Sequence, residues 1–151
     1  MKKWIVFCLT LLISFTLVAC NSNSKEETVT LKTEENGVIM ELTYKAVGDK
    51  VIEQTANNVM PYESLGVTTP EEAKKILAEF VVGYDETEGI THNIDYQDEQ
   101  AVEKLTIDYE TADLNEVGKL TGASFEGDVD KGISLEKSIE MLEEQGFEVV
   151  E

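Results

Sequence analysis

Two alternating segments joined by Asn36-Gly37 restrict the fold more than any other feature of the sequence. Asparagine followed by glycine readily adopts the positive φ angles that a tight hairpin turn requires. Apolar and polar residues alternate over 28–33 before this turn and over 38–47 after it. Since successive side chains of a strand point to opposite faces, each segment has two distinct faces. The pattern therefore predicts an antiparallel hairpin with one core face and one half-solvated face.

The same alternation predicts three further strands. Gly48-Asp49 turns the chain into a third strand over 51–60, and we expect a weak end at this strand because Pro61 cannot donate a backbone hydrogen bond. Alternation returns over 90–96, a polar turn follows, and a returning strand contains Leu105, Ile107 and Tyr109. These residues predict a second hairpin.

Capping residues and apolar spacing predict three helices. Thr69-Pro70 begins the first, and apolar residues spaced three and four apart continue it to about Gly83. Asp113 caps a short helix, and Ser134 opens the last one, which Gly146 ends. The expected fold is α+β, with an antiparallel sheet of about five strands and two main helices and one short helix packed on one face.

The first 20 residues have the pattern of an export signal. Lys2 and Lys3 precede an apolar run that is too short for a comfortable membrane span. The run ends in Leu-Val-Ala-Cys20, which resembles the lipobox of bacterial lipoproteins, where the cysteine receives a diacylglyceryl group and cleavage occurs just before it. An ordinary secretory signal and an uncleaved anchor helix are the alternatives.

This interpretation divides the chain into three parts: a lipoprotein signal peptide over 1–19, a lipidated Cys20 with a flexible tether over 20–27, and one extracytoplasmic domain over 28–151. Two or three acyl chains exceed the threshold for stable attachment to a membrane. We therefore expect the protein at the cell membrane, anchored by lipid on the extracytoplasmic side.

The charge excludes several classes of protein. The chain has 12 lysines, no arginine and 31 acidic residues, and loss of Lys2 and Lys3 with the signal changes its net charge from -19 to -21. Nucleic-acid binding needs a clustered basic surface, so we expect no nucleic-acid partner. Cys8 leaves with the signal and Cys20 carries the lipid, so the sequence predicts neither a disulfide nor thiol chemistry in the mature protein.

Several segments along the chain resemble one known family. They are the lipobox, 34–44, 48–51, 94–96, 130–134 and 141–147. Together they look like the YehR-like bacterial lipoproteins, and the resemblance covers essentially the whole chain. Its motifs are turn glycines, caps and core positions, so it implies an α+β lipoprotein domain without a catalytic signature.

The candidates for chemistry are few. His92 is the only histidine and alternates in phase with apolar residues, which favours a structural or surface histidine over a catalytic base. The segment 126–137 resembles a calcium loop, but Lys131 stands where the turn glycine belongs and Lys137 where a bidentate glutamate should close the site. The acidic cluster between residues 95 and 113 is more often a solvated face than a paired-carboxylate site; its members are Asp95, Asp98, Glu99, Glu103, Asp108, Glu110 and Asp113.

Two hypotheses follow for the function. The leading one is a non-catalytic binding module that uses the second face of the strand 38–47, where Ile39, Thr43, Lys45 and Val47 mix apolar and polar groups. Its partner would be an envelope protein or a cationic ligand, because the acidic charge attracts basic groups. The alternative is a carboxylate-based domain that binds calcium or hydrolyses a substrate with a metal. We expect no cofactor.

Overall fold

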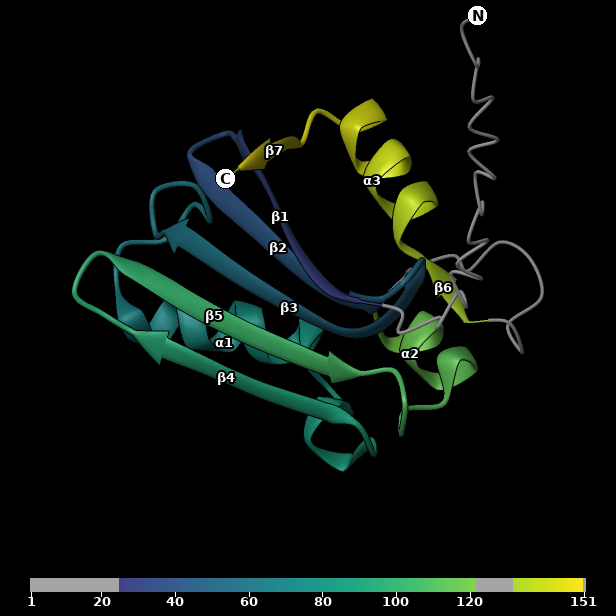
Figure 1. Cartoon of the computed structure of the whole chain (residues 1–151). Coiled ribbons are helices and arrows are strands. Elements are labelled where there is room, and N and C mark those ends of the chain that lie inside the picture. Colours follow the sequence, from purple (N-terminus) through teal and green to yellow (C-terminus); the bar gives the residue numbers. More distant parts are fainter. Residues whose placement is uncertain (1–24, 122–131, 151) are drawn as a thin grey trace, which may run out of the picture.

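The computed structural model describes residues 25–121 and 132–150, which form one antiparallel seven-stranded sheet and three α-helices (Figure 1). The strands follow the order β4-β5-β3-β2-β1-β7, and β6 pairs with β3. The elements are, in chain order, β1 Glu26–Glu35, β2 Val38–Val47, β3 Lys50–Pro61, α1 Pro70–Phe80, the 3-10 helix η1 Tyr84–Glu86, β4 Ile90–Tyr96, β5 Gln100–Asp108, α2 Leu114–Thr121, β6 Ile133–Ser134, α3 Leu135–Glu144 and β7 Glu148–Val150.

The expected first hairpin is present. Asn36 and Gly37 have φ angles of 52° and 83°, the combination that joins twisted antiparallel strands through a two-residue turn. The turn sets a register in which Leu31 pairs with Leu42 and brings their side chains to the same face. β1 starts at Glu26, inside the segment 20–27 that the sequence analysis assigns to the tether.

The expected number of about five strands is wrong, because the sheet has seven. β6 has two residues and β7 has three, and such lengths are too short to show alternation in a sequence. β6 is aligned by its pairing with the start of β3, and β7 by its pairing with β1. The structure also adds the short helix η1, a single turn that starts at Tyr84.

The third strand is longer and more central than its sequence predicts. β3 runs through Asn57 and Asn58 to Pro61 and pairs with β2 on one side and β5 on the other. Asn58 is accommodated because its side-chain amide donates to Glu103 at 2.7 Å. Pro61 is tolerated because it stands at the end of the strand.

The helices begin at the expected caps. Thr69 accepts the backbone N–H of Glu72, and the Glu72 carboxylate accepts from Thr68 and Thr69 in return. Asp113 accepts the first N–H groups of α2 in the same way. Ser134 caps α3. These donors hold the pKa values of the Glu72 and Asp113 carboxyls below their usual range, chiefly through hydrogen bonds from backbone N–H groups.

The hydrophobic core lies on one face of the sheet. Three clusters follow one another along it, and each combines strand residues of the same face with one helix. Leu31 and Tyr44 pack against α3, Leu105 and Ile107 against α2, and Met60 against α1. The strand register places all of these side chains on the same side, so the helices that the structure describes cover one face of the sheet and none of them lies on the other.

Candidate functional site

The uncovered side of the sheet, which we call the open face, carries the residues that the sequence analysis proposes for binding. Ile39, Thr43, Lys45 and Val47 all lie there on β2, opposite the buried side chains of Tyr44 and Ala46. The first three are half-buried, and Val47 is 38% exposed. The open face is therefore accessible, although neighbouring strands cover part of each side chain.

A row of five threonines crosses the open face. Thr30 on β1 pairs with Thr43 on β2, which pairs with Thr55 on β3; Thr106 on β5 and Thr91 on β4 continue the row. We call these five residues the threonine row. Two hydroxyl pairs within it are hydrogen-bonded, at 3.0 Å between Thr30 and Thr43 and at 3.2 Å between Thr55 and Thr106. Cross-strand threonine pairs of this kind stabilise a sheet by about 0.2–1 kcal/mol each.

Polar residues flank the threonine row on both sides. On one side, Lys45 forms an ion pair with Glu53 at 2.6 Å, and hydrogen bonding to Glu53 raises the pKa of the Lys45 ammonium. On the other side, Asn57, Lys104 and Asn93 lie next to one another on β3, β5 and β4. The open face thus offers hydroxyls, amides and ammonium groups, which donate hydrogen bonds to a partner.

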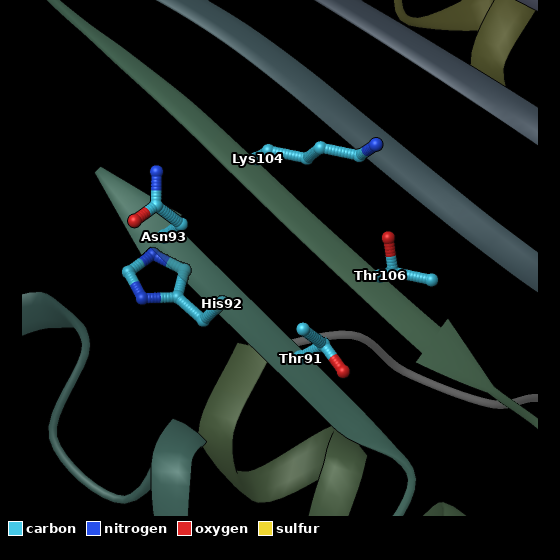
Figure 2. A pocket seen from close by; sticks show the side chains of 5 residues that line it. All are labelled: Thr91, His92, Asn93, Lys104 and Thr106. Carbon is cyan, nitrogen blue, oxygen red and sulfur yellow. The ribbon is translucent and has the colours of Figure 1, made fainter. Parts of the chain in front are cut away.

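A depression of about 270 Å³ opens at the β4 end of this surface (Figure 2). Thr91 and Asn93 of β4 and Lys104 and Thr106 of β5 line it, together with His92. Within the described parts of the chain, no ion pair holds Lys104. The depression therefore brings hydroxyl, amide and ammonium groups together on the open face.

His92 itself points to the covered face. Its Nε2 lies 2.8 Å from Oε1 of Glu103, and the other oxygen of Glu103 accepts from Asn58. The side chains of His92 and Glu103 are only 7% and 15% exposed. The Tyr84 ring packs edge-on against the imidazole at 5.1 Å. The sequence analysis expected a structural histidine but not this partner, because the two residues meet only through the pairing of β4 with β5.

A histidine beside a carboxylate is also the start of an acid–base arrangement, so its neighbours decide its chemistry. The neighbours of the pair include the Asn58 amide and the phenols of Tyr84 and Tyr96. An amide is not a nucleophile. Burial, and then the charge of Glu103, raise the pKa of the Tyr84 phenol, which keeps it protonated. These neighbours support a structural role for the pair.

We expect His92→Gln to lower the free energy of unfolding by only about 1 kcal/mol, since glutamine can still donate a hydrogen bond to Glu103. His92→Leu should lower the free energy of unfolding by about 3 kcal/mol, because the largely buried Glu103 carboxylate then loses its bond to the imidazole. Chemical unfolding of both variants measures the difference. Equal losses for the two substitutions would show that the hydrogen bond contributes nothing.

The acidic residues of the sequence analysis do not converge on one site. Glu103 bonds His92, Asp95 accepts from Gln97, Asp108 accepts the N–H of Glu110, and Asp113 caps α2. Across residues 25–121 and 132–150, no three His, Cys, Asp or Glu side chains come together as a metal site would require. The first half of the calcium-like segment 126–137, residues 126–131, lies outside the described residues, so the calcium hypothesis stays untested there.

Cys20, the expected site of lipidation, also lies outside the described residues. Among the residues that the structure does describe, no helix is both long and apolar enough to cross a membrane. The first described residue, Lys25, lies next to the β2–β3 turn, since its carbonyl accepts from the N–H of Gly48.

Known proteins share both the sequence and the fold. The family described as "Protein of unknown function (DUF1307)" matches residues 27–148. The uncharacterized lipoprotein Lin0239 of Listeria innocua is 42% identical over the whole chain and 97% of its own length. The uncharacterized lipoprotein YehR of Escherichia coli is 31% identical over 90% of this chain and 88% of its own.

Two solved structures resemble this one. The NMR structure of E. coli YehR superposes with a TM-score of 0.74 at 32% identity and covers 84% of this chain and 92% of that one. An NMR structure of a protein from Streptococcus pneumoniae covers 99% of this chain and 100% of its own, with a TM-score of 0.59 at 12% identity, and shares the fold alone. The expected resemblance is confirmed: the chain belongs to the DUF1307 family of YehR-like bacterial lipoproteins.

Proposed function

We propose that this lipoprotein is a non-catalytic binding module that holds a partner on its open face while lipid on Cys20 keeps it at the extracytoplasmic side of the cell membrane. One observation supports the proposal above the others. All three helices and all three core clusters lie on one face of the sheet, and the opposite face presents the threonine row without a covering element among the described residues.

The tether explains how a binding surface of modest affinity is useful. A short polar segment, from Cys20 to the residues just before β1 begins at Glu26, would link the lipid to the domain and hold it close to the membrane. Confinement of this kind raises the effective concentration of the domain near a membrane or envelope partner. Binding therefore needs no large interface.

The composition favours binding over turnover. The mature chain would contain one histidine, no arginine and no free thiol, which leaves hydroxyls and carboxylates as the reactive groups. His92 is engaged with Glu103 on the covered face, away from the threonine row. The net charge favours basic proteins or cationic ligands over anionic polymers, an attraction that acts over a Debye length of about 8 Å.

The proposal is tested by crosslinking the lipoprotein in its own cells, with and without changes to the open face. The double variant Thr43→Glu, Lys45→Glu adds negative charge and bulk to the middle of this face. We expect the amount of crosslinked partner to fall at least tenfold, because the two changes remove a hydroxyl and an ammonium donor from adjoining rows of this face and add bulk there. This loss of fit and of hydrogen bonds should outweigh the added attraction of a basic partner to the new carboxylates.

A matched control makes the same charge change on the helix side. Ala78→Glu, Lys75→Glu alters two exposed positions of α1 and should leave the partner in place. Thermal unfolding of both double variants checks that they fold. A partner that persists unchanged on the open-face variant would reject this surface, and substrate turnover that one carboxylate substitution abolishes would reject binding as the function.

A further inference from the structure

The two edges of the sheet differ in how they are protected. At one edge, β7 pairs with the middle of β1, and β1 carries five charged residues out of ten. β4 forms the other edge (Figure 1). It has seven residues, one charged side chain at Asp95, no proline and no bulge. Charges, short strands and covering segments are the usual means by which proteins keep edge strands from pairing. β4 has few of them, so it is the edge available to another strand.

The hydrogen-bond pattern identifies which backbone groups are available. The Gly89 carbonyl accepts from the N–H of Asp108, and Gln97 donates to the carbonyl of Gln100. In an antiparallel ladder such pairs alternate, so Thr91, Asn93 and Asp95 also bond to β5. The N–H groups of His92, Ile94 and Tyr96 then point away from β5, where none of the described strands pairs with β4.

The segment that contains this edge carries acidic charge only, and Lys104 follows it on β5, one strand in from the edge. The segment 76–103, which includes β4, contains no lysine or arginine. Its acidic residues are Glu79, Asp85, Glu86, Glu88, Asp95, Asp98, Glu99 and Glu103. η1, with Asp85 and Glu86, contacts β4 near its start, and Asp98 and Glu99 form the turn at its end. A second copy of the chain would bring the same acidic segment alongside and be repelled. A basic segment would be attracted.

We propose that the free edge of β4 binds an extended, basic segment of a partner polypeptide, which adds to the sheet as a further strand. The backbone bonds would be made by His92, Ile94 and Tyr96, and this mode of recognition is known as strand addition. This edge is separate from the centre of the open face, so the inference does not depend on the function proposed above.

The side chains of β4 define the sequence that fits. Residues of the added strand that face the helices would lie beside Ile90, Ile94 and Tyr96, which favours apolar groups. Residues on the other face would lie beside Thr91, Asn93 and Asp95, where a lysine or arginine can pair with the exposed Asp95 carboxylate. The partner segment therefore alternates apolar with basic and polar residues.

Amide hydrogen exchange tests this inference residue by residue. The probe is an end-blocked octapeptide of alternating valine and lysine, added to the full-length lipoprotein in a neutral detergent. We expect the amides of His92, Ile94 and Tyr96 to exchange at least tenfold more slowly with the peptide, because they become hydrogen-bonded. Those of Thr91, Asn93 and Asp95 are bonded already and should change little.

Two controls separate strand addition from general attraction by charge. A peptide methylated on every backbone nitrogen keeps its charge but loses the backbone donors of both its edges, and it should not protect these amides. Asp95→Asn should lower the affinity for the unmodified peptide about three- to fivefold, which is the typical contribution of a cross-strand charge pair. Glu34→Gln, at the other end of the same cross-strand row, should leave affinity unchanged.

Each remaining outcome overturns the inference. Absence of binding would exclude this edge as a site for basic segments. Binding without slower exchange at His92, Ile94 and Tyr96, or equal binding of the methylated peptide, would show diffuse attraction only. Protection that appears without peptide and increases with protein concentration would identify a second copy as the occupant. None of these results bears on Thr43 or Lys45, so the open face is judged separately.

Discussion

Replacing Cys20 with serine is expected to abolish lipid labelling and to leave an unprocessed precursor. Under the lipobox hypothesis the Cys20 sulfur receives the diacylglyceryl group, and a serine hydroxyl is a much weaker nucleophile than a thiolate. Cleavage before residue 20 should then fail as well. Metabolic labelling with a radioactive fatty acid, followed by the mass of the purified chain, measures both steps.

Cys8 provides a matched control for this experiment. It is the other cysteine of the chain and lies within the apolar run of the signal, so Cys8→Ser should label and mature normally. A wild-type protein that is secreted without lipid and starts at a residue other than Cys20 would contradict the anchoring account.

The second large effect concerns Gly89, which leads into β4 with a φ of +80°. A Cβ at this position would lie 2.7 Å from both the backbone nitrogen and the Cβ of Ala112. The backbone cannot swing aside as a flexible side chain does, so Gly89→Ala combines a steric clash with an unfavourable φ. We expect it to lower the free energy of unfolding by about 3 kcal/mol or more, measured by chemical denaturation.

Gly66 separates the two causes of this loss. Its φ is +71°, but a Cβ there would meet nothing within 4 Å. Gly66→Ala should therefore cost only the backbone contribution, about 1 kcal/mol. Equal losses for Gly66→Ala and Gly89→Ala would show that contact between the β4 entry and Ala112 does not limit stability.

The parts of the fold that the sequence predicts are those with local causes. Asn36-Gly37 determines its hairpin, and Thr69 with Glu72 determines the start of α1, because the interacting groups are within a few residues of one another. β6 and β7 have no such local cause. They are strands only because β3 and β1 lie beside them, and that placement depends on the whole sheet.

The candidate site divides in the same way. Alternation along β2 suffices to place Thr43 and Lys45 on the face opposite Tyr44. The threonine row needs the register of five strands, which no single segment contains. The bond between His92 and Glu103 likewise needs the alignment of β4 with β5. A threonine near the middle of each of several strands was the available signal for the row.

Site-specific photocrosslinking of the lipidated protein in its own cells tests the central claim most directly. The photoreactive residue is placed singly at Thr43 and Thr55 in the threonine row, and at Lys75 and Ala78 on the exposed side of α1. The account predicts the same crosslinked partner from Thr43 and Thr55 and none from Lys75 or Ala78. A partner captured from α1 but not from the threonine row would contradict it.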